Sequence, residues 1–456
     1  MIVSFTVSNF RSFSSEETLS LIASNRLSDS HRDHTCSVPD SKENVLKTGV
    51  IYGANGAGKS NLFKALKYLK TLALKPKKKH SGTDREKFRF DVTSNEPSVF
   101  DLLFINNNKL YRYGVKVDDH RIIEEWLVHI IGAKEKLLYE RVTDENGQVE
   151  IDATGLKSPS DKLRALVTVG GLQNQSFLAT IQATLDAPDF GEQITDVISW
   201  FDDSLTLIAP DTSFGSLGQL LDSDLDFLEF AGSFLKSAST GVDHLLIQKN
   251  EISEEELRNL LGKRYASKLL DDITEDKNSV AVIQLNQGIE LLVERADENH
   301  FYRITIQAAH EFQSGNVVSL DLTEESDGTR RLLNLLPALH ILRTSNAVFF
   351  IDEIDRSLHP KLAWEFLEFF LKSCQSGQHQ IIVTTHESNL LDLDLLRRDE
   401  IWFAEKDPLG ASHLYSLSDF KIRTDLDIRK HYLQGRFGAI PFLRNLTGLL
   451  ENEVVT

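Results

Sequence analysis

The feature that most constrains this chain is a glycine-rich stretch that begins at residue 53. It reads Gly-Ala-Asn-Gly-Ala-Gly-Lys-Ser and fits the pattern G-x-x-x-x-G-K-[S/T]. The β-prone residues 48–52 precede it, and residues 61–74 carry apolar side chains at helical spacing. In such a strand–loop–helix context, glycines let backbone N–H groups turn toward phosphate oxygens, and the helix N-terminus adds positive potential. A chance glycine-rich turn is the alternative, and the context disfavours it.

This loop predicts a nucleotide site with Mg²⁺. We expect Lys59 to hold the β- and γ-phosphates of the nucleotide and the Ser60 hydroxyl to bind the metal. The other candidate nucleotide-binding residues of the loop and of the helix that follows it are Gly53, Asn55, Gly56, Gly58 and Asn61.

Two apolar strands later in the chain end in polar residues. Asp352 and Glu353 follow Val-Phe-Phe-Ile, so Asp352 is predicted to hold Mg²⁺ and Glu353 to accept a proton from attacking water. A surface carboxylate is the alternative for Glu353. Residues 381–385 form the second strand, and His386 after it is predicted to hydrogen-bond a γ-phosphate and report its loss. A histidine that only caps the strand is the structural alternative.

The apolar patterns also predict the domain organisation. A meander of antiparallel strands is expected in the first part of the chain, a mostly helical part with a charged insertion at 251–276 follows, and strands return after it. Alternation of strand and helix near the end favours a parallel α/β sheet, and a helix is expected to follow His386. Predicted strands lie at 2–7, 48–52, 99–105, 110–117, 122–131, 279–284, 288–294, 302–307, 347–351 and 380–384, and predicted helices at 61–74, within 160–275, and at 331–342 and 362–371.

Charge and composition limit the ligands and the cellular location that we expect for the chain. The net charge of −18 disfavours tight, nonspecific binding of nucleic acid by the chain as a whole. One basic cluster (Lys75, Lys77, Lys78 and Lys79) is either a solvated turn, which we favour, or a contact with a phosphate backbone. The cysteines, Cys36 and Cys374, can form neither a disulfide framework nor a zinc ribbon. No apolar run approaches the length of a membrane span and no secretory signal begins the chain, so a cytoplasmic location is expected.

The order of these motifs resembles that of the ABC ATPases, which also need a signature sequence ahead of the Asp-Glu strand. Glu325-Ser326-Asp327-Gly328-Thr329-Arg330 is similar to that signature, with Ser326 at a helix start and Gly328 allowing close approach to a phosphate. It departs from the usual Leu-Ser-Gly-Gly-Gln, and a plain N-cap turn is the alternative. Asp355 matches the D-loop of the family.

The N-terminus narrows the resemblance. Asn9-Phe10-Arg11-Ser12-Phe13 is similar to the start of SMC-like ATPases, which implies that Arg11 contacts a phosphate. The wide separation of Ser60 from Ser326 is the split arrangement of SMC-like proteins. Without heptads in between, no long coiled coil is expected.

The chain most resembles ABC-like ATPases of bacterial anti-phage and abortive-infection systems: the PARIS ATPase subunit, the RloA/AbiLi type and the ATPase half of OLD nucleases. Residues 352–360, 399–406 and 432–441 also look like that group. The resemblance implies an α/β fold, an ABC-type P-loop NTPase with a mixed central sheet, an antiparallel β lobe and a helical insertion. The predicted domains are 1–160 (N-terminal half of the ATPase head with the meander), 161–300 (helical insertion and returning strands) and 301–456 (C-terminal half of the head).

The resemblance also implies partners. ATP is expected to join two copies head to tail, or a larger oligomer, with the signature of one copy on the phosphate loop of the other. A separately encoded nuclease or toxin is expected as effector and a phage-derived molecule as trigger. Asp224-Leu225-Asp226 and Asp392-Leu393-Asp394 are expected to be structural, and too little chain follows His386 for a nuclease domain. The alternative is an SMC-like ATPase of DNA repair or DNA ends, and DNA binding stays open.

Overall fold

The computed structural model describes residues 1–90, 95–157, 159–211, 214, 217–274, 280–286, 289–295, 299–312, 315–341, 346–373, 377–422 and 426–441. Contacts divide the chain into two compact units. The first comprises Met1–Pro210, Asn346–Asp355 and Trp364–Thr456, and the second Asp211–Ser345 and Arg356–Ala363. The three-domain division therefore stays a prediction. No helix within these described ranges is long and apolar enough to cross a membrane.

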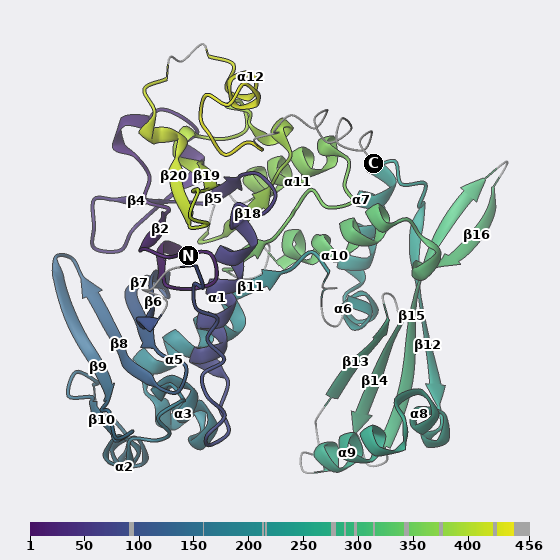
Figure 1. The fold of residues 1–456 in the computed structure, drawn as a ribbon. Helices are drawn as coiled ribbons and strands as arrows, with labels where there is room; N and C mark the ends of the chain where they lie inside the picture. Colours follow the sequence, from purple (N-terminus) through teal and green to yellow (C-terminus); the bar gives the residue numbers. More distant parts are fainter. Residues whose placement is uncertain are drawn as a thin grey trace, which may run out of the picture. The chain divides into compact units, whose positions relative to one another are not determined.

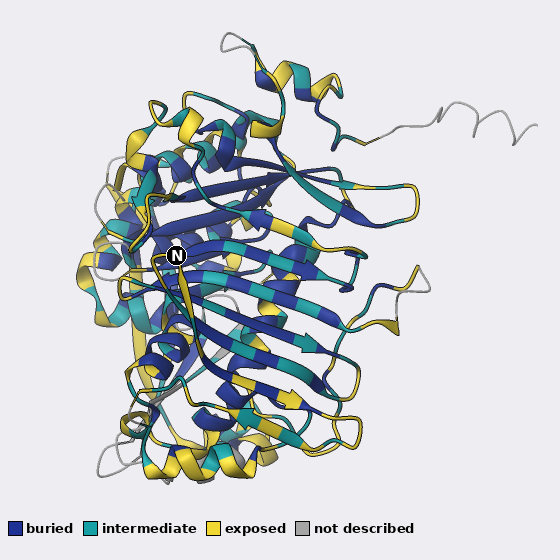
Figure 2. Ribbon diagram, turned by 90° about the vertical axis from the view of Figure 1, so that its left-hand side faces the viewer, coloured by how far each residue is buried: buried dark blue, intermediate teal, exposed yellow. Residues whose placement is uncertain are grey.

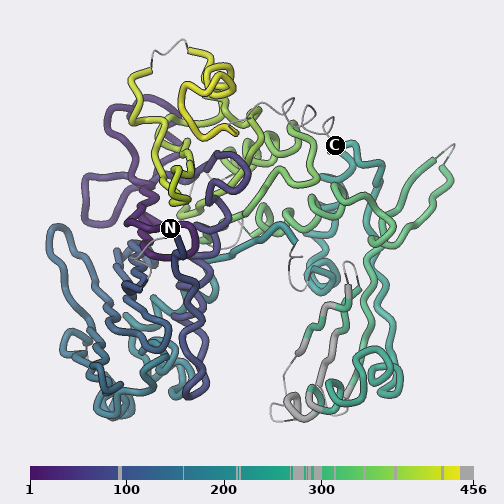
Figure 3. Tube along the Cα trace, viewed as in Figure 1, coloured from purple at the N-terminus to yellow at the C-terminus, as the bar shows by residue number. Residues whose placement is uncertain are grey.

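A six-stranded mixed sheet forms the centre of the first unit, in the order β11–β17–β18–β5–β19–β20. All its strands run parallel except β20, which pairs antiparallel with β19, so segments from both ends of the chain meet in one sheet (Figures 1 and 3). The predicted parallel α/β arrangement is confirmed. The strands are β11 (Leu205–Ile208), β17 (Val348–Ile351), β18 (Gln380–Thr385), β5 (Thr48–Tyr52), β19 (Ile401–Lys406) and β20 (Ser412–Ser416).

Helix α1 (Lys59–Leu74) contacts both sheets of this unit. Its Phe63 ring meets Phe350 of β17 edge to face at 5.4 Å, and Tyr68 lies 5.3 Å from Phe100 of the second sheet. The helix ends at Leu74 because Lys75 precedes Pro76 and takes an extended conformation. The apolar spacing that predicts this helix is thus the face that fills the core.

The second sheet of the unit is antiparallel and seven-stranded, in the order β10–β9–β8–β7–β6–β1–β2. Buried and half-buried residues alternate along the first part of β6, so alternate residues of this strand face the core. Figure 2 shows such alternation as bands of buried and intermediate residues along the strands. The predicted strand at 2–7 and the predicted meander are confirmed. The strands are β1 (Ile2–Ser8), β2 (Glu17–Ser20), β6 (Ser98–Asn106), β7 (Lys109–Val117), β8 (Ile122–Ile131), β9 (Lys134–Thr143) and β10 (Val149–Asp152).

Short elements complete the first unit. Residues 25–46 contain two 3-10 helices (Asn25–Leu27 and Arg32–His34) and a small hairpin of β3 (Thr35–Ser37) and β4 (Asn44–Leu46). The remaining helices are α2 (Asp161–Val169), α3 (Phe177–Thr184), α4 (Ala187–Phe190), α5 (Glu192–Ser199), a π-helix (Trp200–Ser204), α12 (Ile428–Leu433), and 3-10 helices at Ser388–Leu390, Arg398–Glu400 and Leu417–Asp419. Helix α11 (Pro360–Ser373) belongs to this unit from Trp364 onward, and its residues 360–363 belong to the second unit.

The second unit contains a five-stranded antiparallel sheet in which β16 pairs with β15 beside the order β12–β15–β14–β13. A small apolar cluster around Leu257, Leu291 and Phe301 stabilises it. Its strands are β12 (His244–Ile252), β13 (Val280–Asn286), β14 (Ile289–Arg295), β15 (Asn299–Phe312) and β16 (Asn316–Asp321), and its helices are α6 (Leu217–Ser223), α7 (Leu225–Ser237), α8 (Glu254–Leu261), α9 (Lys263–Thr274), α10 (Asp327–Ile341) and a 3-10 turn (Leu322–Glu324).

Three expectations are wrong. Strands β11 and β12 lie within residues predicted to be mostly helical, because pairing with β17 and β15 overrides the local pattern. The helix expected after His386 is a 3-10 turn followed by loops. The charged insertion is helical as predicted, in α8 and α9. The predicted ends at residues 275–276, 279, 288 and 342 lie outside the described residues.

Candidate nucleotide-binding site

The glycine-rich loop joins β5 to α1, as the sequence predicts. Tyr52 ends the strand and Lys59 begins the helix. The Lys59 ammonium donates to the backbone carbonyls of Gly53, at 2.6 Å, and Ala54, at 3.2 Å. Asn55 and Gly56 are exposed at the turn. Lys59 is therefore held over the loop by the loop's own backbone, where a phosphate bound to the N–H groups would also lie.

Gly58 shows why the loop needs glycine at this position. Its backbone φ of +113° is one that residues with side chains rarely adopt, and a Cβ there would lie 2.2 Å from the Ser412 hydroxyl oxygen. Ser412, on β20, in turn lies 2.7 Å from the Ala57 carbonyl and 2.8 Å from the Ser12 hydroxyl. Asn61 donates to the same Ser12 hydroxyl at 2.8 Å, so its amide supports the loop from the side.

The predicted metal ligands lie together at the carboxyl edge of the six-stranded sheet. The Ser60 hydroxyl donates to Asp352 Oδ1 at 3.2 Å. Thr384, on β18, donates to the same oxygen at 2.6 Å and accepts the Glu353 N–H at 2.8 Å. Glu353 is half-buried and has a φ of +50°, a strained conformation for a residue with a side chain. Residues 352 and 353 therefore form a tight turn beside Ser60.

His386 and Asp355 also meet in this unit. His386 Nδ1 lies 3.1 Å from Asp355 Oδ2, with the histidine half-exposed and the aspartate buried. Burial lowers the pKa of the Lys59 ammonium below its ordinary value, and the charges of Asp355, Glu353 and Asp352 partly offset that fall. Lys59 thus lies in the field of the three carboxylates that the sequence places at this edge.

Arg11 lies next to Ser12, and therefore beside the loop, but its guanidinium pairs with Glu86. Its backbone N–H donates to the Glu86 carbonyl at 2.7 Å, and its φ is +52°. Its contact with a phosphate stays a prediction.

The predicted signature residues lie in the second unit, at the start of α10. Ser326 accepts the Thr329 N–H at 3.1 Å, which is the N-cap geometry named above as the structural alternative. A Cβ on Gly328 would lie 2.8 Å from the Ser357 carbonyl, so glycine permits that close approach. Within one chain these residues serve the helix start, and their contact with a nucleotide stays a prediction.

The residues present fit Mg²⁺. A hydroxyl and a carboxylate within hydrogen-bond distance, Ser60 and Asp352, offer the oxygen ligands that Mg²⁺ prefers, and Mg²⁺ in such sites takes further ligands from phosphates and water. Among the described residues no group of three or more His, Cys, Asp or Glu side chains forms a metal site of its own. A site shared with the nucleotide is the arrangement that suits this donor set.

Sequence reasoning missed Thr384, Ser412, Ser12 and Glu86. Thr384 and Ser412 are single hydroxyl residues in strands, which local sequence does not distinguish from ordinary β-formers. The predicted structural roles of the two Asp-x-Asp pairs agree with their contacts: Asp224 caps α7 and accepts from Phe227 N–H, and Asp392 accepts from the Trp364 indole.

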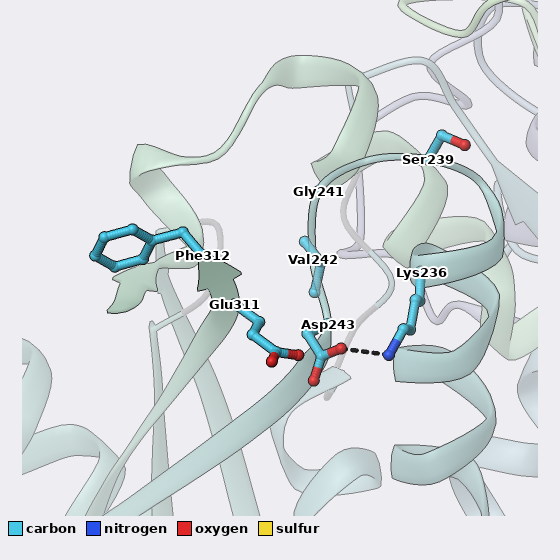
Figure 4. Close-up of a pocket in the computed structure, with 7 residues that line it drawn as sticks. All are labelled: Lys236, Ser239, Gly241, Val242, Asp243, Glu311 and Phe312. Atoms are coloured by element: carbon cyan, nitrogen blue, oxygen red, sulfur yellow. Dashed lines mark hydrogen bonds and ion pairs between the residues drawn. The ribbon is translucent and has the colours of Figure 1, made fainter. Parts of the chain in front are cut away.

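A separate pocket of about 560 Å³ lies in the second unit, between α7 and β15, and contains none of the predicted site residues (Figure 4). Its Lys236 and Asp243 form an ion pair at one wall, and Glu311 and the half-exposed Phe312 line the other. None of the residues that line it belongs to the motifs described above.

We compared the chain with curated proteins, with solved structures and with protein families. No curated protein matches the chain. Solved structures that are similar to it include three SMC head domains. One is bound to the C-winged helix domain of ScpA (12% identity, TM-score 0.36, 91% of this chain and 97% of that one covered). Another is from Thermotoga maritima (13% identity, TM-score 0.36, 92% and 99% covered), and the third, with an extended coiled coil bound to the C-terminal domain of ScpA, is from Pyrococcus furiosus (12% identity, TM-score 0.34, 91% and 96% covered). At these TM-scores the likeness adds nothing about function.

The family match covers most of the chain. The family described as "AAA domain, putative AbiEii toxin, Type IV TA system" matches residues 50–392, a span that begins just before the phosphate loop and ends just after His386. The matched span thus contains Lys59, Asp352 and Glu353. The chain belongs to this family of P-loop ATPase domains.

Proposed function

We propose that this protein hydrolyses ATP in an Mg²⁺-dependent reaction and uses the cycle to join and separate two copies of itself. The observation that carries the proposal is the meeting of Ser60, Asp352 and Thr384 through one carboxylate oxygen, directly below the Lys59 loop. These residues come from distant parts of the sequence, and phosphoryl transfer needs such groups to be held together around the phosphates and the metal.

The chemistry follows from what each group can do. Bound Mg²⁺ would neutralise charge on the β- and γ-phosphates, with Ser60 and Asp352 as protein ligands. Lys59 and the backbone N–H groups of residues 53–60 bind and orient the phosphates. The Glu353 carboxylate accepts a proton from the attacking water. His386, held by Asp355, contacts the γ-phosphate and registers its loss.

The proposed output is a change of assembly. Ser326 and Gly328 of one copy close on the phosphates held by the other, so ATP stabilises a head-to-tail dimer and hydrolysis loosens it. We propose that this switch senses infection and controls a separate nuclease or toxin in bacterial defence. The family description, which names the AbiEii toxin and a toxin–antitoxin system, supports the defence setting.

A Glu353→Gln variant tests the hydrolytic proposal. Loss of the general base is expected to lower kcat by about 100-fold or more, whereas ATP binding persists. The trapped nucleotide should then hold the chain as a dimer, measured by light scattering after gel filtration with Mg²⁺ and ATP.

The control is Glu368→Gln, which removes a partly exposed carboxylate of α11 that pairs with the exposed Lys372. It should hydrolyse ATP like the wild type. Wild-type turnover by Glu353→Gln would refute the assignment of the base.

A second candidate, a DNA-dependent ATPase, is favoured by a basic surface on α1 and the loop after it. Lys64, Lys67, Lys75, Lys78 and Lys79 are exposed and make no ion pair within the described residues, whereas Lys77 of the predicted cluster pairs with Asp84. Hydrolysis that duplex DNA stimulates, with a steep loss at higher salt, would favour this candidate. Hydrolysis indifferent to DNA would exclude it.

A further inference from the structure

Thr384 holds the Asp352–Glu353 motif through one side chain. It is fully buried near the end of β18, between the strand that precedes Asp352 and the strand that leads to the phosphate loop. Its hydroxyl donates to Asp352 Oδ1 at 2.6 Å and accepts the Glu353 N–H at 2.8 Å. Its backbone carbonyl accepts the Ile354 N–H at 3.1 Å.

The Thr384 hydroxyl donates one hydrogen bond and accepts one. Its one O–H proton is donated to Asp352 Oδ1 and so restrains the orientation of that carboxylate. One oxygen lone pair accepts the N–H of Glu353, the residue with the strained backbone. Ser60 donates to the same carboxylate oxygen. The rotation of the Asp352 carboxylate is therefore set from both sides.

The same strand holds both ends of residues 352–355. Thr384 binds the first two of them, and His386, just beyond the strand, binds Asp355 at 3.1 Å.

We propose that Thr384 is a positioning residue of the nucleotide site: its hydroxyl orients Asp352 toward the metal and holds the Glu353 turn. This inference rests on the proposed function: the Mg²⁺ dependence of ATP hydrolysis is expected to rely on the Thr384 hydroxyl. It assigns Thr384 no contact with substrate.

The test compares Thr384→Val, which keeps the shape and removes the hydroxyl, with Thr384→Ser, which keeps the hydroxyl. The matched control is Thr48→Val on neighbouring β5. Thr48 is also fully buried, and its hydroxyl has no hydrogen-bond partner within the described ranges. Each protein is assayed for ATP hydrolysis over a range of Mg²⁺ concentrations, for Mg²⁺-dependent binding of a fluorescent ATP analogue, and for its melting temperature.

For Thr384→Val we expect the Mg²⁺ concentration at half-maximal rate and at half-maximal binding to rise roughly 10- to 100-fold, the usual effect of losing a group that orients a metal ligand. Thr384→Ser and Thr48→Val should stay close to the wild type in both readouts. A role in stability alone would lower the melting temperature without moving the Mg²⁺ dependence.

Unchanged Mg²⁺ dependence in Thr384→Val would overturn the proposal. So would an equal loss in Thr384→Ser, which decides the matter even if the valine variant does not fold. If the wild type binds the analogue with Mg²⁺ but hydrolyses no ATP, the proposed function fails, and the binding titrations still decide the role of Thr384.

Discussion

Gly56 and Gly58 lie two residues apart in the phosphate loop and have different surroundings. Both have positive φ, +80° and +113°, so both positions strain an ordinary residue. A Cβ on Gly56 meets nothing within 4 Å, whereas one on Gly58 meets Ser412 and Ser12. The sequence pattern requires glycine at both positions. Only the packing of β20 against the loop shows that a side chain would strain the backbone at Gly56, and would both strain the backbone and clash at Gly58.

The glycine pair gives a prediction at the scale of single residues. Gly56→Ala should lower the free energy of unfolding by roughly 1–2 kcal/mol, the penalty for a residue with a side chain in a left-handed conformation. Gly58→Ala should cost clearly more, because the methyl group also displaces Ser412 from the Ala57 carbonyl. Melting temperatures of the two variants measure this order, and equal losses would contradict it.

At the scale of elements, the sequence predicts strands well where apolar residues alternate and a turn follows, as in β6 to β8. It fails for β11 and β12. β11 is only four residues long and is stabilised by β17, which lies far away in the chain. β12 is mostly exposed and carries polar residues, so its pattern looks like a solvated helix until β15 pairs with it.

The candidate site divides in the same way. Lys59, Ser60, Asp352 and Glu353 are predictable because each lies in a motif whose spacing carries the chemistry. Thr384 is not, because its partners are distant in sequence and a threonine in a strand is unremarkable until register places it beside Asp352. Register between parallel strands is a property of the fold, which local sequence does not encode.

One contact between the two sheets of the first unit joins a histidine to a carboxylate. His413 of β20 lies 2.7 Å from Glu17 of β2 and 3.4 Å from Asp407. Burial alone would lower the pKa of His413, but these two carboxylates outweigh it, and the net shift is upward. A folded-state pKa raised above the unfolded value of about 6.5 stabilises the fold below that value, and the gain is lost as pH rises through the folded pKa.

His413→Asn should therefore lower the melting temperature more at pH 6 than at pH 9. The control is His120→Asn, at an exposed histidine whose side chain makes no ion pair in the part of the chain that the structure describes. An equal loss at both pH values would show that His413 acts through packing and not through its charge.

At the scale of the whole molecule, the predicted parts of one catalytic cycle lie in two units. The phosphate loop, Asp352, Glu353 and His386 belong to the first, and Ser326 and Gly328 to the second. Within one chain, Ser326 is already used as the N-cap of α10. Our account requires the signature of a second copy to approach the nucleotide, and this is the claim on which the switch depends.

Crosslinking between copies tests that claim most directly. In a chain with Cys36 and Cys374 replaced by serine and with Glu353→Gln, one tagged copy carries Asn55→Cys and a differently tagged copy carries Asp327→Cys, both at exposed positions. With Mg²⁺ and ATP, a short thiol crosslinker should join the two tags, and it should not do so without nucleotide. Absence of the crosslinked pair, in a preparation that binds ATP, would contradict the composite site and the switch built on it.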